Sequence, residues 1–144
     1  MRGFQEESTI QSDSPTASKE CFRVLLSIIA CKRWKIQCID IKSAFLQGKV
    51  LQRDVYLVPP KEAGTEGKLW KLFKCVYGLN DASRVWYFTV WEELETLGCK
   101  RSPVDFGIFT WYDVNKNLAG VFQSHVDDFM WAGTSNFHEL VILP

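Results

Sequence analysis

The sequence predicts an α+β domain in which helices lie on one face of an antiparallel sheet. Three observations favour this class. Two segments with helical periodicity alternate with segments rich in strand formers. The last third of the chain reads as a strand, a loop and a hairpin, and hairpin strands are antiparallel. The chain has 144 residues, 47% of them apolar and 14% aromatic, which suits one domain with a real hydrophobic core.

The first predicted element is a helix from about residue 15 to residue 31. Ser14 followed by Pro15 is a good pairing of helix N-cap and first helical position. The apolar side chains that share one face of this helix are Phe22, Leu25, Leu26 and Ile29. Residues 34–41 then alternate as a strand does. Both faces of this strand are mixed, which fits a sheet with one covered side and one side that lines a cleft.

The middle of the chain predicts a turn, two strands and a second helix. Residues 42–48 turn or coil briefly, and residues 50–58 form a strand that two prolines end. Residues 61–67 are a loop, and residues 68–77 a strand or hairpin arm. Asp81 or Ser83 caps a helix that runs to about Leu97, with Gly98 as its end.

The last third predicts three strands. They cover residues 106–112, 118–125 and 129–132, with a turn at 113–117. The segment between the last two strands is Val126, Asp127 and Asp128, at the tip of a hairpin with apolar arms.

Composition limits the function classes. The formal charge is zero, from 17 basic and 17 acidic side chains, whereas a freestanding nucleic-acid binder is usually basic. Any attraction to nucleic acid must therefore be local or come from other parts of a longer protein. The five cysteines form no metal-ligand pattern and predict reduced thiols in an intracellular protein. The polar residues 1–11 are no signal peptide, and no apolar stretch approaches about 20 residues, so we expect no membrane span.

Asp127 and Asp128 are the most informative pair. Aspartate favours turns, so two in a row at a tip also fit a purely structural turn. A metal site is the alternative, because adjacent carboxylates repel each other and Mg²⁺ relieves that repulsion. Asp40 ends an apolar strand 87 positions before Asp127 (127 − 40). If these strands are neighbours, three carboxylates meet at one end of a sheet and form a two-metal site for phosphoryl transfer.

Three blocks in order resemble the catalytic blocks of copia-type reverse transcriptases, the RNA-directed DNA polymerases of LTR-retrotransposon Pol polyproteins. The blocks are Asp40-Ile-Lys-Ser-Ala-Phe-Leu-Gln-Gly48, the run Leu69-Trp-Lys-Leu-Phe-Lys-Cys-Val-Tyr-Gly-Leu79 leading into Ala82-Ser-Arg-Val-Trp-Tyr87, and His125-Val-Asp-Asp128. The resemblance extends from Arg2-Gly-Phe-Gln-Glu6 to Gly133. One block would be weak evidence, but three in the same order are strong.

The resemblance implies metal and nucleotide roles by position. Asp40 and Asp127 would bind two Mg²⁺ ions, or Mn²⁺, with Asp128 beside them and the carbonyl of Ile41 completing one shell. Main-chain N–H groups at Lys42, Ser43 and Ala44 would lie near the triphosphate.

Two further positions carry open alternatives. Phe45 would lie under the sugar and exclude a ribose 2′-hydroxyl, although it also fits a plain core aromatic. Tyr77 and Gly78 would lie near template and nucleotide, although a turn before a helix explains them equally well.

The resemblance also places Arg84, His125 and Val126 near the primer and template. Two departures from the family pattern bear on nucleic-acid affinity. His125 stands where the third block usually has Tyr, and Asn80–Asp81 stands where the second block often has Lys-Gln. The second change removes a positive charge and adds a negative one where template would pass.

As a whole, the resemblance implies one partial reverse transcriptase domain over residues 1–144, namely a palm with part of the fingers and without thumb or RNase H. It implies a polymerase core that extends a primer 3′-hydroxyl, with template-primer and deoxynucleoside triphosphates as partners. We expect a cytoplasmic element that forms virus-like particles, with integrase and RNase H in the parent Pol polyprotein and no membrane.

Three functions compete at this stage. The first is that polymerase core, which we expect to be inactive as this segment alone. The second is a non-catalytic relic or nucleic-acid-binding module that keeps the fold. The third is a metal-dependent phosphodiesterase, against which Phe45 and the Tyr77–Gly78 block speak, because a nuclease needs neither.

Overall fold

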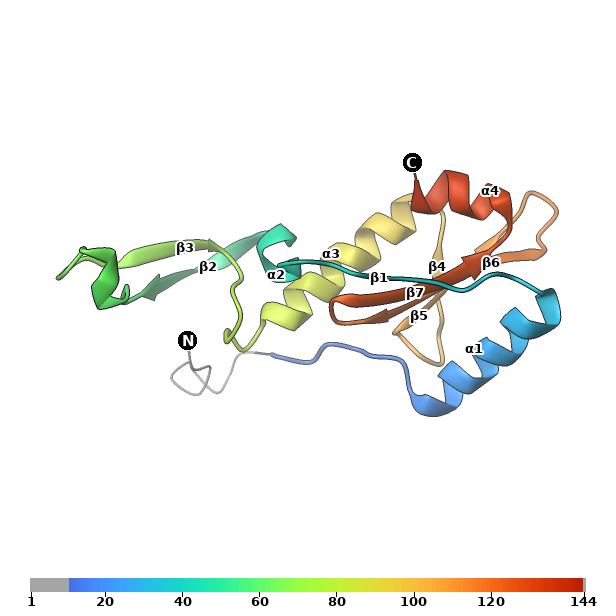
Figure 1. Cartoon of the computed structure of the whole chain (residues 1–144), viewed down its shortest axis with the longest axis horizontal. Helices are drawn as coiled ribbons and strands as arrows, with labels where there is room; N and C mark the ends of the chain where they lie inside the picture. The colour runs from blue at the N-terminus through green and yellow to red at the C-terminus, as the bar shows by residue number, and fades with distance from the viewer. Residues whose placement is uncertain (1–10, 144) are drawn as a thin grey trace.

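A computed structural model of the chain describes residues 11–143. The block Arg2–Glu6 and the polar start, apart from Gln11, lie outside these residues. The elements follow in the order shown in Figure 1. They are α1 (Lys19–Lys32), β1 (Gln37–Asp40), α2 (Ala44–Gln47), β2 (Val50–Leu57), the short 3₁₀ helix η2 (Lys61–Ala63), β3 (Trp70–Lys74), α3 (Ala82–Thr96), β4 (Lys100–Arg101), β5 (Ile108–Tyr112), β6 (Leu118–His125), β7 (Asp128–Gly133), α4 (Ser135–Phe137) and the π-helical turn η3 (His138–Ile142).

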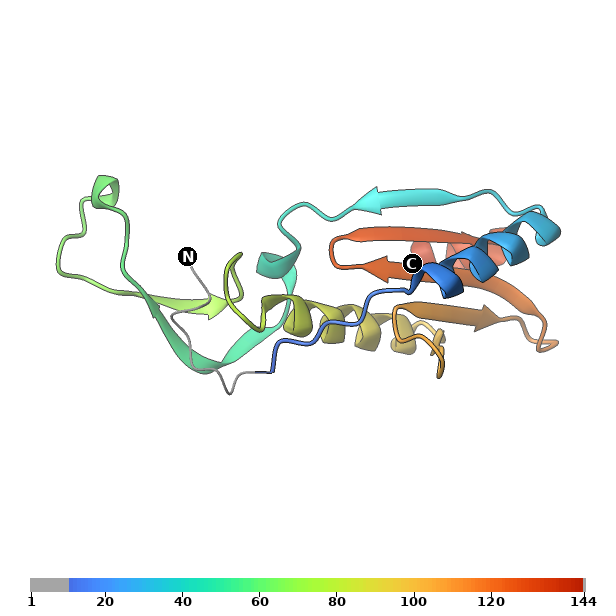
Figure 2. The same ribbon diagram turned by 90° about the horizontal axis from the view of Figure 1, so that it is seen from below.

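The described residues contain two antiparallel sheets. Five strands form the larger sheet in the order β1-β7-β6-β5-β4, and β2 pairs with β3 in a separate hairpin. Figures 1 and 2 show this hairpin extending away from the five-stranded sheet. We call it the arm. The predicted α+β class with an antiparallel sheet is confirmed.

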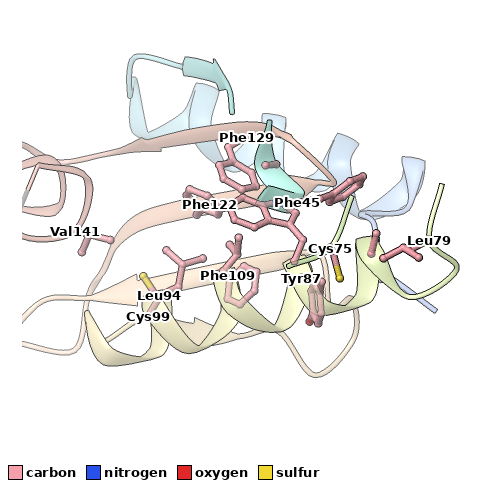
Figure 3. Close-up of a cluster of buried hydrophobic side chains, with 14 of the residues drawn as sticks. Phe45, Cys75, Leu79, Tyr87, Leu94, Cys99, Phe109, Phe122, Phe129 and Val141 are labelled. Atoms are coloured by element: carbon pink, nitrogen blue, oxygen red, sulfur yellow. The ribbon is translucent and has the colours of Figure 1, made fainter. Parts of the chain in front are cut away.

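Helices cover both faces of the five-stranded sheet, so the expectation of helices on one face was wrong. Leu25 and Ile29 of α1 pack against Ile108, Val121 and Met130. Their neighbours along the three strands point to the other face, where Phe109, Phe122 and Phe129 pack with side chains of α3 (Figure 3). The second covered face was not predicted because these strands are apolar runs, and such runs do not indicate which helix packs on which side of the sheet.

The short helix α4 shares the α3 face. Phe137 belongs to the same core cluster and is almost fully buried. Its ring lies where side chains of β6 and β7 would otherwise be, since a Cβ added at Gly120 would come within 2.2 Å of it. Gly120 therefore leaves the space that the Phe137 ring of α4 occupies. Residues 134–143 carried no prediction.

Several element boundaries differ from the prediction. The first helix begins at Lys19 instead of Pro15, because the Ser18 side chain caps it by accepting from the Cys21 N–H. The backbone N–H of Ser18 donates to Asp105 Oδ2 at 2.7 Å, which ties the preceding segment to the loop before β5. The buried face of α1, with Leu25 and Ile29, is as predicted.

Most other elements are close to their predicted bounds. The strands predicted at 34–41, 68–77 and 106–112 are shorter, and β4 was not predicted. The strand over 118–125, the turn at 113–117 and the helical end at Gly98, with φ 83°, are confirmed. Among residues 11–143, none of the helices combines the length and the apolar character that a membrane crossing needs.

Candidate active site

The backbones of the three candidate carboxylates meet at one end of the sheet. Strand β1 pairs with β7, and Asp40 lies directly opposite Asp128. The N–H of Ile41 donates to the carbonyl of Asp127 at 2.9 Å. The predicted neighbourhood of the two strands is therefore confirmed, although their carboxylates come from segments far apart in the chain.

Asp40, Asp128 and His125 project on the α1 face. Asp128 pairs with Asp40 on one side and with His125 on the other. Residues two apart along a strand lie on the same face, and Asp128 is two residues from Met130, which packs in the α1 cluster. A groove of about 450 Å³ opens on this side. Its lining includes Asp40 and Asp128 together with Phe22, Cys38, Ile39, Gln123, Phe129 and Met130.

Val126 and Asp127 form the two-residue turn between β6 and β7. Val126 has φ 59°, the left-handed region that a β-branched residue rarely adopts, and Asp127 does not share this sign. Positive φ at the first central position alone is the pattern of a type II′ turn. The hairpin tip predicted at these residues is confirmed. Strain held at a hairpin tip is frequent at functional sites.

The carboxylate of Asp127 turns toward Tyr77 instead of toward its neighbour. The Tyr77 hydroxyl donates to Asp127 Oδ2 at 3.3 Å. Desolvation first, then the charge of Asp127 and this hydrogen bond, and then the charge of Asp40 raise the pKa of Tyr77 above its ordinary value. The phenol thus senses both carboxylates. Among residues 11–143, no three His, Cys, Asp or Glu side chains are disposed to hold a metal ion.

Tyr77 and Gly78 occupy the corner of a turn. The N–H of Leu79 donates to the carbonyl of Val76 at 3.2 Å, and Gly78 has φ 94°. A positive φ at the third turn position requires glycine or asparagine, which explains Gly78. The turn before the helix is therefore confirmed, and it holds Tyr77 against Asp127.

Phe45 is a core residue of this structure. Its side chain is 8% exposed and its ring centroid lies 4.5 Å from that of Tyr77. Figure 3 shows it within the cluster between the sheet and α3. The core-aromatic alternative is thus borne out, and the contact with Tyr77 also puts the ring one residue away from Asp127.

The segment after Asp40 forms the short helix α2. Ser43 has φ 56° and precedes the helix. The side-chain amide of Gln47 donates to the carbonyl of Lys42 at 2.9 Å. Lys42 and Ser43 are exposed and Ala44 is fully buried. Lys42 and Ser43 are therefore the accessible positions of this segment.

Arg84 points toward the N-terminal segment. Its guanidinium donates to the carbonyl of Asp13 at 3.3 Å and lies 4.9 Å from the Phe88 ring centroid. Both contacts are with residues outside the β6–β7 hairpin, whereas the resemblance groups Arg84 with His125 and Val126 near primer and template.

The negative charge at Asp81 is compensated within the fold. Asp81 is the N-cap residue of α3, but its carboxylate makes a two-pronged ion pair with Arg53 of β2, at 3.1 and 2.8 Å, instead of capping the helix. This pair links α3 to the arm. The departure at Asn80–Asp81 therefore leaves no free charge from Asp81 in this region.

One contact of the hairpin tip was not predicted. The indole N–H of Trp86 donates to the carbonyl of Val126 at 2.7 Å. Helical periodicity places Trp86 on the buried face of α3, and it is 7% exposed. A buried tryptophan N–H usually finds an acceptor, and that rule was the available signal.

Most of the chain is similar to known proteins. Residues 1–140 match the family described as "Reverse transcriptase (RNA-dependent DNA polymerase)". The chain is similar to the retrovirus-related Pol polyprotein from transposon RE1 of Arabidopsis thaliana, with 33% identity over 124 residues. It is also similar to the corresponding polyproteins from transposon TNT 1-94 of Nicotiana tabacum, 33% over 93 residues, and from transposon RE2 of Arabidopsis thaliana, 31% over 99 residues.

These alignments cover much of this chain and little of its relatives. They include 83%, 60% and 67% of the chain but 8%, 7% and 7% of the three polyproteins. The chain therefore spans less than a tenth of the length of these relatives. No solved structure matches the chain significantly.

Proposed function

This chain belongs to the reverse transcriptase (RNA-dependent DNA polymerase) family, and we propose that it forms the palm, with part of the fingers, of the polymerase in a copia-type transposon Pol polyprotein. The five-stranded sheet with α1 and α3 is the proposed palm, and the arm is the proposed piece of the fingers. The reaction is the addition of deoxynucleotides to a primer 3′-hydroxyl on an RNA or DNA template.

One observation carries this proposal. Asp40 at the end of β1 lies opposite Asp128, and the neighbouring Ile41 N–H is bonded to the Asp127 carbonyl. A turn built for structure alone does not need a third acidic residue on the adjacent strand. Three carboxylates at one sheet end are what phosphoryl transfer with two cations requires.

The donor set suits hard cations. Asp40, Asp127 and Asp128 offer only oxygen ligands, which Mg²⁺ and Mn²⁺ prefer. We assign Asp40 and Asp127 as the shared ligands, Asp128 as the less direct one and the Ile41 carbonyl as a backbone ligand. Bound there, the two ions would lower the pKa of the attacking hydroxyl and stabilise charge at phosphorus.

The residues around the carboxylates position the Asp127 side chain and are the proposed contacts of nucleotide, primer and template. The Ile41–Asp127 bond fixes the two strands relative to each other, and Tyr77 positions the Asp127 carboxylate through its hydroxyl. Exposed Lys42 and Ser43, with the backbone of Ala44, are the proposed triphosphate contacts. Tyr77 and Gly78 are the proposed nucleotide contacts, and Arg84, His125 and Val126 the proposed primer and template neighbours.

Phe45 is the proposed sugar discriminator. Its ring belongs to the core cluster and lies against Tyr77, whose hydroxyl donates to Asp127. Phe45→Ala in an active parent polymerase should raise ribonucleotide incorporation relative to deoxynucleotides, because the ring would leave no room for a 2′-oxygen. Primer extension with matched nucleotide pairs measures this, and unchanged selectivity would leave Phe45 as a core residue only.

The partners follow from the family. We propose template-primer and deoxynucleoside triphosphates as ligands, and integrase and RNase H as other parts of the same polyprotein. We also propose a cytoplasmic element with virus-like particles. None of the five cysteines forms a disulfide, which fits a reducing compartment.

A non-catalytic relic remains the second candidate. It is favoured by the absence, among residues 11–143, of three acidic or other metal-binding side chains disposed around one point. The Asp127 carboxylate faces Tyr77. On this view the fold persists as a module that no longer binds catalytic ions.

Primer extension separates the two candidates. A longer Pol segment that contains residues 1–144 should extend oligo(dT) on poly(rA) with Mg²⁺ or Mn²⁺, and Asp127→Asn should abolish extension. The 144 residues alone should not extend processively, because 17 basic side chains are balanced by 17 acidic ones and leave few cations for a duplex. Equal extension by wild type and Asp127→Asn would refute the proposed catalytic role.

A further inference from the structure

Trp86 lies directly beneath the turn that carries Asp127. The residue belongs to the first half of α3 and is 7% exposed. Its indole N–H reaches the carbonyl of Val126 at 2.7 Å, and its ring stacks on Phe129 of β7 with centroids 6.2 Å apart and planes 11° apart. Trp86 also borders Gly48, where an added Cβ would lie 3.8 Å from the ring.

These contacts join three segments of the candidate site. Gly48 ends the α2 segment that follows Asp40, Val126 precedes Asp127, and Phe129 follows Asp128. The side chain therefore contacts the residues next to Asp127 and Asp128 and borders the end of the segment that follows Asp40. It contributes no ligand of its own, since an indole N–H is a donor only.

The accepting carbonyl belongs to the central peptide of the turn. Type I′ and type II′ turns differ by a flip of this peptide, and the flip changes the sign of φ at the second central residue. Here that residue is Asp127, which keeps a negative φ while Val126 has φ 59°. A donor held under the Val126 carbonyl favours one of the two turns.

We propose that Trp86 is a positioning residue for the catalytic turn. Its N–H holds the Val126–Asp127 peptide in the orientation that leaves the Asp127 carbonyl on the Ile41 N–H and the Asp127 side chain at the site. The inference rests on the proposed function for the role of Asp127, but the turn selection itself depends only on the hydrogen bond.

The same helix offers a matched control. The indole N–H of Trp91 is buried and has no hydrogen-bond partner in the part of the chain that the structure describes. Its ring instead lies under the guanidinium of Arg101, 3.8 Å from the ring centroid. Replacing Trp91 by Phe removes an indole N–H without removing a bond to the turn.

The test uses the 144-residue chain and amide hydrogen exchange at Ile41. Trp86→Phe keeps an aromatic ring, and benzothienylalanine at position 86 keeps the ring shape while removing the donor. Both should speed exchange at the Ile41 amide by about tenfold, the effect of losing one hydrogen bond. The Asp127 amide–α-proton coupling should also change, and Trp91→Phe should leave both quantities as in the wild type.

Unchanged Ile41 exchange and Asp127 coupling in both position-86 variants would overturn the proposal. Unfolding of the benzothienylalanine protein would also count against it, because a role confined to the turn does not unfold the core. Mn²⁺ titration of the same proteins provides the separate readout. If wild type binds no Mn²⁺ through Asp127, the proposed metal site fails while the exchange result still decides the role of Trp86.

Discussion

The five-stranded sheet and the arm differ in how much of their strands is covered. In the sheet, β5, β6 and β7 bury apolar side chains on both faces, against α1 on one side and α3 on the other. In the arm, Val55 is the buried residue of β2, while Val50, Tyr56, Trp70 and Phe73 are exposed. Apolar strand residues thus end in opposite environments within one chain.

This difference in burial indicates that the five-stranded sheet contributes more to the stability of the molecule than the arm. A two-stranded hairpin is marginally stable by itself, and the arm is covered only where Val55, Leu51 and Leu72 pack against the core cluster. The sheet needs no such support, because two helical layers remove its apolar surface from water. The candidate site lies between these regions: the β6–β7 turn belongs to the sheet, and Tyr77 follows the last strand of the arm.

Aromatic truncations should give the largest contrast. Phe109→Ala, at a position 1% exposed in the core, should lower the free energy of unfolding by about 3–5 kcal/mol. Phe73→Ala, at an arm position 67% exposed, should change it by less than about 0.5 kcal/mol. Denaturant unfolding followed by circular dichroism measures both, and equal losses would show that the arm is as well covered as the sheet.

Asp105 should give the next effect. This buried carboxylate accepts the N–H groups of Ser18 and Gly107, at 2.7 and 3.0 Å, and so ties the start of α1 to the sheet. Asp105→Asn should cost about 1–3 kcal/mol, since a charged acceptor is lost from a buried network. Asp54→Asn, on the exposed arm, is the control and should cost less than about 1 kcal/mol.

The Asp105 effect has a defined pH dependence. Burial alone would raise the pKa of this carboxyl, but the N–H donors of Ser18 and Gly107 and further hydrogen bonds outweigh burial and lower it. The stabilisation is therefore fully present above the unfolded-state pKa of about 4. It is lost as the pH falls below that value through the folded pKa. Wild type and Asp105→Asn should converge in stability in that acidic range, and a constant difference would contradict this.

Ion pairs should give the smallest contrast. Arg53–Asp81 joins the arm to α3 and is mostly shielded, with side chains 31% and 14% exposed, whereas Lys71–Asp54 lies on the arm surface. Asp81→Asn should cost about 1–2 kcal/mol and Lys71→Gln less than about 0.5 kcal/mol. Thermal unfolding at low and high salt checks this order, and the reverse order would mean that α3 does not anchor the arm.

Local sequence signals predicted the hairpin region well. Asp127–Asp128 between two apolar arms, the turn at 113–117 and the end of α3 at Gly98 depend on neighbours in the chain, and each is where it was expected. The metal-site hypothesis required Asp40 and the hairpin tip to lie on neighbouring strands, and Asp40 does pair with Asp128.

Long-range contacts decided what the sequence could not predict. The start of α1 depends on the bond between Ser18 and Asp105, 87 positions apart. The rotation of the Asp127 carboxylate depends on Tyr77, and the compensation of Asp81 depends on Arg53. None of these partners can be read from local periodicity or capping preference, since they meet only after the sheet and arm have formed.

Mn²⁺ titration of the purified chain, followed by electron paramagnetic resonance, tests the central claim most directly. If Asp40, Asp127 and Asp128 form one cation site, wild type and the Asp54→Asn control should bind Mn²⁺ alike. Asp40→Asn and Asp127→Asn should each weaken binding by at least about tenfold, the range seen when a metal ligand shell is disturbed. Affinity that is unchanged in both variants would show that these carboxylates are turn and strand-end residues without a metal site.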